Sequence, residues 1–139
     1  MEKFTVKIKK VDWIDKGNPE AEVLFEVNGI ELWAFCHPCD FTEDEIADVC
    51  FNIVDEKIIE SIFWDENKEK KKKIVPAKNY RCQYYCYGQL IGIHPVKIDC
   101  GRVVFDYGDW INDERAIGSF VYFVIARLDV SRIKTPTKH

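Results

Sequence analysis

Alternation between apolar and polar residues is the feature that most constrains how this chain can fold. At residues 4–14, the apolar side chains of Phe4, Val6 and Ile8 are separated by single polar residues. A period of two places such side chains on one face of an extended strand, so this segment predicts a half-buried β-strand. Comparable β-rich runs cover residues 21–35, 47–53, 80–93, 96–99, 103–107 and 120–130. The pattern predicts an all-β protein with at most short helical turns.

Turn residues divide these runs into hairpins. Asn28-Gly29 interrupts the run at 21–35, and this dipeptide accommodates the two positive φ angles of a type I′ turn. Cys100-Gly101 marks another turn between two β-rich runs. Two β-hairpins are therefore expected. The His94-Pro95 step ends the strand before the second hairpin, because proline has no amide donor for a strand ladder.

Two segments leave their secondary structure open. Thr42 and Glu45 have the spacing of a helix capping box, yet the residues that follow alternate as a strand. At most one helical turn is expected there. Residues 54–64 suit either a helix face or a strand, and a long hairpin is the favoured interpretation.

The length of 139 residues corresponds to one domain, and a chain of this size buries roughly two-thirds of its unfolded surface. The two halves of the sequence also match each other when one is shifted by 72 residues. The match reflects either a true duplication or the similarity of any two β-rich segments whose apolar residues alternate in phase. If duplicated, two such units could close one barrel, which removes exposed strand edges. The predicted fold is a single closed or partly open, OB-like β-barrel. The matched pairs are Gly29 and Gly101, Leu32 and Val104, Trp33 and Phe105, Phe35 and Tyr107, Val49 and Val121, Phe51 and Phe123, and Ile53 and Ile125.

Glycine-containing segments punctuate the strands of the second half. They are GQLIGI at 88–93, VKIDCG at 96–101 and GSFVYFVI at 118–125, followed by Leu128-Asp129. Over residues 87–130 this arrangement resembles the S1-like branch of the OB-fold nucleic-acid-binding barrels. The resemblance implies a small barrel whose aromatic and basic face binds single strands. No site residue is carried over from that family.

The N-terminal sequence MEKFTVKIKK carries a charge at every second or third position. It therefore has no apolar stretch for a signal peptide or membrane anchor, and a cytoplasmic location without membrane contact is expected. In that compartment the six cysteines stay reduced. Burial, metal binding or redox chemistry then explains them better than disulfides do.

Charge is distributed unevenly along the chain, although the net charge is only -4. Residues 40–66 contain ten acidic residues against the single base Lys57, and Lys70 to Lys73 follow shortly afterwards. We expect one barrel domain over residues 1–139 with a charged excursion at about 55–79. The lysines are expected at a solvated loop tip, and the tail at 134–139 is expected to fray.

A non-enzymatic protein-binding module of the immunity or adaptor type is the first functional hypothesis. Acidic surfaces with an aromatic anchor suit basic protein partners, because opposite charge steers the encounter and a buried ring contributes binding energy. The acidic segment contains such an anchor. The predicted contact residues are Asp44, Glu45, Asp48, Glu60 and Trp64.

Binding of single-stranded nucleic acid is the alternative hypothesis. Tyrosines on one face of the strand at 80–93 could stack on unpaired bases, and neighbouring cations could bind phosphate. The competing structural interpretation places these tyrosines at the barrel rim with their hydroxyls in water. The acidic balance of the chain also weakens the nucleic-acid hypothesis. Its predicted contact residues are Lys70, Lys71, Lys72, Lys73, Arg81, Tyr85 and Tyr87.

A zinc-stabilised module is the third hypothesis. Cys36, His37 and Cys39 are the candidate ligands, because a CxxC turn can present two thiolates to zinc. Cys82 and Cys86 would lie about 13 Å apart on a strand that rises about 3.3 Å per residue, too far apart to share the ion. The acids after Cys39 disfavour redox chemistry, because negative charge raises a thiol pKa. The expectation is therefore no cofactor, with packing as the role of most cysteines.

Catalysis is not expected. The sequence contains no GxSxG, HExxH, Walker or GxGxxG pattern. The histidines are His37 in the CxxC turn, His94 before a proline and His139 at the terminus. None of these positions indicates a convergent catalytic set, so the sequence predicts a binding protein.

Overall fold

The computed structural model describes residues 2–54, 67–106, 108 and 112–134. This part of the chain is all-β, as the alternation predicts, and it contains ten strands and one 3-10 turn. No helix among the described residues is long and apolar enough to cross a membrane. The strands are β1 (Phe4–Asp15), β2 (Glu20–Val27), β3 (Ile30–Cys36), β4 (Ile46–Val54), β5 (Lys73–Pro76), β6 (Tyr84–Ile93), β7 (Val96–Asp99), β8 (Val104–Asp106), β9 (Phe120–Ile125) and β10 (Arg127–Arg132), and the turn is η1 (Glu114–Ala116).

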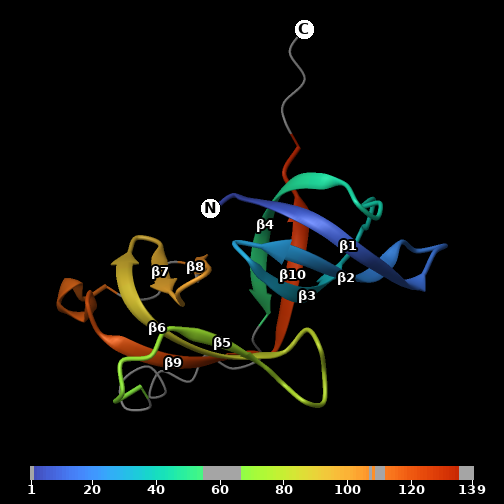
Figure 1. Ribbon diagram of the computed structural model, residues 1–139. Helices are drawn as coiled ribbons and strands as arrows, with labels where there is room; N and C mark the ends of the chain where they lie inside the picture. The colour runs from blue at the N-terminus through green and yellow to red at the C-terminus, as the bar shows by residue number, and fades with distance from the viewer. Residues whose placement is uncertain (1, 55–66, 107, 109–111, 135–139) are drawn as a thin grey trace, which may run out of the picture.

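Five strands form a closed barrel in the order β1-β2-β3-β10-β4 (Figure 1). Its strand pairs are antiparallel except β3 and β10, which run parallel where Asp129 lies opposite Phe35. The barrel closes because β4 pairs with β1, with Val6 opposite Ala47. Closure removes an edge that another chain could join. The predicted closed barrel is therefore confirmed.

The β2–β3 hairpin turns at Asn28-Gly29, whose φ angles are 49° and 85°. Two positive φ angles confirm the predicted type I′ turn. Asn28 Nδ2 donates a hydrogen bond of 2.7 Å to the carbonyl of Arg102, and Arg102 Nη1 donates one of 3.3 Å to the carbonyl of Asn28. Arg102 belongs to the β7–β8 connection, so the tips of the two predicted hairpins contact each other.

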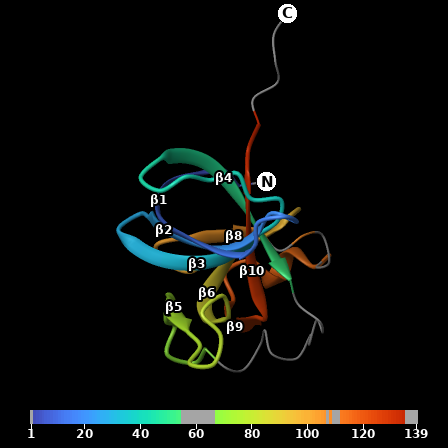
Figure 2. The ribbon, with the colours of Figure 1, turned by 90° about the vertical axis from the view of Figure 1, so that its right-hand side faces the viewer.

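The second sheet curls beside the barrel and is built around the long strand β6 (Figure 2). β9 pairs with one edge of β6, β5 and β7 pair with successive parts of the other edge, and β8 pairs with β7. Gly88 lies where β6 approaches β7. A Cβ atom there would be 2.6 Å from the carbonyl oxygen of Asp99 and 2.7 Å from the Ile98 side chain. The two strands can approach this closely because residue 88 has no side chain.

The strand pairing of the barrel recurs in the second sheet. In the barrel, β1-β2-β3 form a meander and β4 returns to β1. In the second sheet, β6-β7-β8 form a meander and β9 returns to β6. Gly29 and Gly101, which match at the 72-residue offset, both have positive φ at equivalent turns. The two units do not join into one barrel, because β10 closes the first unit alone.

The β-rich run at residues 120–130 is divided between the two sheets. β9 ends at Ile125 in the second sheet, and β10 starts at Arg127 in the barrel. The spacing of the buried residues marks this break. Ile125 and Leu128 are three positions apart in the sequence, whereas successive buried residues within each of the two strands are two positions apart. Most of the segment 87–130 that resembles S1-like barrels consequently lies in the second sheet and outside the closed barrel.

One continuous hydrophobic core spans the barrel and the second sheet. Phe51 of β4 connects them: its ring centroid lies 4.9 Å from that of Phe4 and 5.4 Å from that of Phe25. The same ring centroid lies 6.4 Å from that of Phe105 in β8. Aromatic pairs at such separations attract each other. The two sheets therefore share their apolar interior.

One local prediction needs correction. The strand predicted from residue 80 begins at Tyr84, because the chain first turns, with the Gln83 N–H donating to the Tyr80 carbonyl at 3.0 Å. The segment between Thr42 and Glu45 is a turn without a helix, which agrees with the expected limit of one helical turn. The Glu45 carboxylate accepts a hydrogen bond of 2.8 Å from the Thr42 N–H, which is half of a capping box.

The charged excursion expected at residues 55–79 is described only from residue 67 onward. There Lys70, Lys71 and Lys72 are exposed and lie outside the strands, and Lys73 begins β5, which pairs with β6. Val54 ends β4, so one end of the ambiguous segment 54–64 is strand. Residues 55–64 lie outside the described residues, as does the tail beyond residue 134.

Candidate functional site

The outer face of the second sheet gathers aromatic side chains from two paired strands. On β6, Tyr85 and Tyr87 alternate with buried residues, and Tyr85 keeps 38% of its surface exposed. On β9, Phe120 and Tyr122 alternate in the same way, and Tyr122 lies directly opposite Tyr87 with 5.1 Å between ring centroids. The sequence hypotheses include the first two rings but not the other two. The alternation within residues 120–125 is the signal that places the second pair on the same side.

Two lysines of the run at 70–73 lie over these rings. Lys73 Nζ is 5.2 Å from the ring centroid of Tyr87, and Lys70 Nζ is 5.9 Å from that of Phe120. Both separations are within the range of a cation–π interaction. Lys73 reaches Tyr87 because the two residues are opposite each other in the β5–β6 ladder. We call this group the lysine–aromatic face, and its members are Lys70, Lys73, Tyr85, Tyr87, Phe120 and Tyr122.

Asn67 fixes the lysine segment to the sheet. Its side chain is buried, and its Nδ2 lies 2.9, 3.3 and 3.1 Å from the carbonyl oxygens of Lys71, Gly88 and Val121. Its Oδ1 accepts a hydrogen bond of 2.8 Å from the Lys71 N–H. One side-chain amide therefore connects the lysine segment to both β6 and β9, which holds that segment above the rings.

The other two lysines of the run are paired with acids. Lys71 Nζ lies 2.6 Å from the carboxylate of Glu69, and Lys72 Nζ lies 3.0 Å from that of Asp99. Burial acts to raise the pKa of Asp99, but the Gly101 N–H and the Lys72 ammonium outweigh it and the pKa is lowered. The predicted phosphate contacts Lys71 and Lys72 thus lie next to the lysine–aromatic face, with acids beside them.

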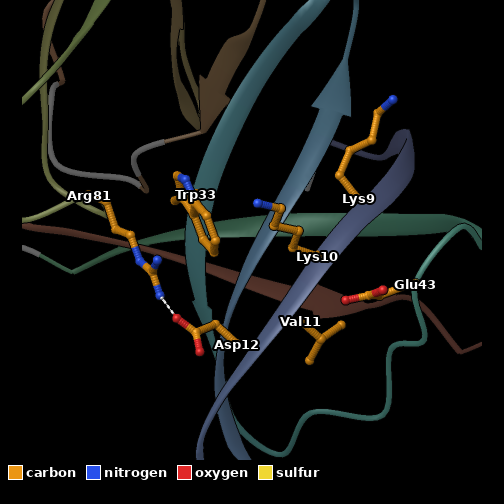
Figure 3. A pocket seen from close by; sticks show the side chains of 7 residues that line it. All are labelled: Lys9, Lys10, Val11, Asp12, Trp33, Glu43 and Arg81. Atoms are coloured by element: carbon orange, nitrogen blue, oxygen red, sulfur yellow. Dashed lines mark hydrogen bonds and ion pairs between the residues drawn. The ribbon is translucent and has the colours of Figure 1, made fainter.

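The structure does not bring Arg81 to this face. Arg81 lies in the turn before β6, with its guanidinium 3.7 Å from the ring centroid of Trp33 on the barrel (Figure 3). Its Nε donates a hydrogen bond of 2.6 Å to Glu22, and its Nη2 donates to Asp12. Its positive charge is therefore used within the chain. Arg81, Trp33 and Asp12 border a pocket of about 380 Å³. The residues that line it are Lys9, Lys10, Val11, Asp12, Trp33, Glu43 and Arg81 (Figure 3).

Two of the acidic residues predicted to contact a protein partner accept hydrogen bonds from other side chains of this protein. Glu45 accepts a hydrogen bond of 2.7 Å from Arg132 Nη2, which lowers the pKa of the Glu45 carboxyl. Asp48 accepts one of 2.7 Å from the Thr5 hydroxyl. Asp44 is exposed, in a turn where its φ is 70°. The remaining predicted contacts, Glu60 and Trp64, lie outside the described residues.

All six cysteines are free and buried. Cys36 ends β3, and its thiol donates to the Pro38 carbonyl at 3.7 Å. Cys39 follows in the next loop, and His37 between the two cysteines is exposed. Cys82 lies in the turn before β6, where burial and the charge of Glu22 raise its pKa to about 12. In the part of the chain that the structure describes, no three His, Cys, Asp or Glu residues are grouped to hold a metal ion. Among the described residues, the candidate zinc ligands Cys36, His37 and Cys39 therefore do not form part of a metal-binding group.

No protein-family model matches this chain, and neither a curated protein nor a solved structure matches it. The lysine–aromatic face combines cations with partly exposed rings. Such a surface suits a ligand that carries both anionic groups and flat rings.

Proposed function

We propose that this protein is a non-enzymatic binding module whose lysine–aromatic face holds single-stranded nucleic acid. The observation that carries the proposal is the placement of Lys70 and Lys73 over the rings of Phe120 and Tyr87. Base stacking on aromatic side chains contributes about 1–3 kcal/mol per base and tolerates any sequence. Lysine contacts to phosphate add attraction that depends on salt.

Binding would exchange one set of contacts for another. In the free protein, the ammonium groups of Lys70 and Lys73 lie against ring faces of the same chain. A phosphate group would draw these ammonium groups away, because charge-assisted contacts to phosphate are stronger than an exposed cation–π contact. The ring faces would then be open to bases. Asn67 would keep the lysine segment in position throughout, since it binds the backbone and not the lysine side chains.

The barrel's own outer face is a less suitable surface for an anionic polymer. OB-type barrels bind oligonucleotides on the face of their second and third strands. In this chain the aromatic residues of β3 are covered, Trp33 by Arg81 and Phe35 by Arg127. The acidic side chains of these two strands would oppose phosphate binding, although Glu22 and Glu26 are paired with Arg81 and Lys9. The acidic positions of these two strands outside the core are Glu20, Glu22, Glu26 and Glu31.

Recognition of a basic protein through the acidic segment is the second proposal. It is supported by Glu43 and Asp44, which are exposed and have no ion pair among the described residues. We rank it second because Arg132 binds both Asp40 and Glu45, which leaves less uncompensated charge for a partner.

A salt titration tests the nucleic-acid proposal. Fluorescence anisotropy of a labelled single-stranded oligonucleotide is measured at increasing salt with wild type and with a Lys70→Gln/Lys73→Gln variant. Removing two phosphate contacts is expected to weaken binding and to reduce the slope of log affinity against log salt by about 1.4, because each contact contributes about 0.7 on a single strand. A Tyr87→Leu variant is expected to bind more weakly with an unchanged slope.

The matched control removes two lysines elsewhere, as Lys16→Gln/Lys78→Gln, since both are exposed. Its slope is expected to stay close to that of wild type. Absence of any anisotropy change for wild type at low salt would reject the proposal. Equal losses in the two double variants would reject the lysine–aromatic face as the binding surface.

A further inference from the structure

The rings of the lysine–aromatic face lie in three successive rows across the second sheet. Phe120 of β9 defines the first row, opposite Gln89 of β6. Tyr87 and Tyr122 lie opposite each other in the second row, and Tyr85 of β6 defines the third. Residues that share one face of a strand are two positions apart, so neighbouring rows are separated by about 6.7 Å. Three aromatic platforms therefore follow one another along the strands.

One lysine accompanies each of the first two rows. Lys70 Nζ lies 5.9 Å from the ring centroid of Phe120, and Lys73 Nζ lies 5.2 Å from that of Tyr87. In the third row, Val75 takes the place that Lys73 has in the second, because Val75 lies opposite Tyr85 in the β5–β6 ladder. The first two rows thus repeat one ring platform and one cation. A polynucleotide repeats the complementary elements, one base and one phosphate in each nucleotide.

The spacing of the rows does not fit a strand whose bases stay stacked on one another. Successive nucleotides of one strand in a duplex are about 3.4 Å apart along the helix axis, which is half of the row spacing. Consecutive bases that bind consecutive rows are therefore separated from each other. Each base then stacks on an aromatic side chain in place of its neighbouring base.

We propose that the lysine–aromatic face is a three-nucleotide site that holds a single strand in an extended, unstacked form. One base lies on each row, and the phosphates contact Lys70 and Lys73. This inference rests on the proposed function and adds to it the number of bases bound and the conformation of the strand. A fourth base would find no further ring of the lysine–aromatic face, so the contribution of stacking to affinity ends at three bases.

Strands of constant charge measure the number of bases bound. Strands of equal length carry one to five consecutive thymines, and every other position is abasic, so the number of phosphates does not change. Fluorescence anisotropy at one salt concentration gives the affinity. The second and the third thymine are each expected to tighten binding by about fivefold or more, since each adds one stacked base. The fourth and the fifth are each expected to add about twofold or less, because they only increase the number of equivalent placements.

The failure of this inference differs from the failure of the proposed function. Equal gains for all five thymines, or no gain after the first, would overturn the three-row site while binding itself remained. No binding of any strand at low salt would reject the proposed function and this inference together.

The extended form of the strand has its own test. Three thymines are placed at alternate positions, so the number of bases and phosphates matches that of the strand with three consecutive thymines. Binding is expected to be weaker by about fivefold or more, because at most two of the three bases then reach rows without looping out a nucleotide. Equal or tighter binding of the alternate strand would reject one base per row.

A variant at the end of the series of rows connects the count to the structure. Tyr85→Leu removes the third platform, so the gain from the third thymine is expected to disappear while the gain from the second remains. Trp13→Leu is the matched control, because Trp13 belongs to β1 of the barrel and its 37% exposure is close to the 38% of Tyr85. Loss of the third gain in both variants, or in neither, would overturn the role of Tyr85.

Discussion

The hydroxyl of Tyr84 makes two hydrogen bonds to one backbone unit of β3: it accepts from the Trp33 N–H at 2.7 Å and donates to the Trp33 carbonyl at 2.8 Å. β3 pairs with β10 at only one residue, where Phe35 faces Asp129. Tyr84 is the first residue of β6 and is 2% exposed. A side chain of the second sheet therefore supplies backbone hydrogen bonds that a neighbouring strand would otherwise provide.

Replacement of Tyr84 tests how much this contact contributes. Tyr84→Phe keeps the ring but leaves the N–H and carbonyl of Trp33 without their partner, which is expected to lower the free energy of unfolding by about 1–3 kcal/mol. Urea denaturation measures the change. The control is Tyr85→Phe, because Tyr85 is the next residue but is 38% exposed; its effect is expected to stay within about 0.5 kcal/mol. Equal effects of the two variants would contradict this role.

Asn67 is expected to stabilise the second sheet. Asn67→Ala removes the amide that binds Lys71, Gly88 and Val121 and leaves buried backbone groups unpaired, so the free energy of unfolding is expected to fall by about 1–3 kcal/mol. Chemical denaturation is again the measurement, with Asn18→Ala at an exposed turn as the control. A loss no greater than in the control would show that Asn67 does not anchor the lysine segment.

Gly88 is expected to tolerate no side chain. In Gly88→Ala the new Cβ would meet the carbonyl oxygen of Asp99 at 2.6 Å, and overpacking of this kind costs about 1–3 kcal/mol. Gly92→Ala is the matched control on the same strand, since its nearest neighbour would lie 3.6 Å away. Thermal unfolding should show a clearly lower midpoint for the first variant alone. Similar midpoints for both variants would show that β6 and β7 can move apart without a loss of stability.

The ion pair between Glu45 and Arg132 predicts a specific dependence of stability on pH. The hydrogen bond from Arg132 lowers the pKa of Glu45 from its ordinary value of 4.5. A lowered folded-state pKa contributes stability that is present above the ordinary value and is lost as the pH falls through the lowered one. Glu45→Gln is therefore expected to be less stable than wild type at neutral pH, by less than about 1 kcal/mol because the pair is partly exposed.

The difference between Glu45→Gln and wild type is expected to shrink as the pH falls below about 4.5. Urea denaturation at a series of pH values measures it, with exposed Glu31→Gln as the control. A difference that stays constant from neutral to acidic pH would show that the pair does not contribute through the charge of Glu45.

Part of the candidate site follows from sequence alone. Alternation puts Tyr85 and Tyr87 on one face and Tyr84 on the other, and the buried and exposed positions of β6 agree with it. The same rule fails for Arg81, because the strand begins three residues later and the turn before it directs Arg81 to Trp33. Periodicity applies only within an element, and the ends of strands depend on contacts that periodicity does not contain.

The charge pattern of the sequence indicates where charged residues are concentrated, but it does not predict which groups they contact in the folded protein. The run of acids after Cys39 predicts a negative surface, yet Asp40 and Glu45 bind Arg132, which lies 92 and 87 residues away in the chain. Lys70 and Lys73 likewise lie over rings of β9 and β6, which the linear charge pattern does not predict. Electrostatic interactions depend on distance in space, so sequence proximity is a poor guide to them.

The sequence by itself determined the strands and the two hairpins, because side-chain alternation and the positive φ of Asn28-Gly29 are local properties of the chain. Only the tertiary structure decided which sheet each strand joins. The chain leaves the second sheet after Ile125 so that β10 can close the barrel, and Tyr84 and Phe51 connect the two sheets through one core. These choices depend on contacts between residues far apart in sequence, where burial and hydrogen bonding are satisfied jointly.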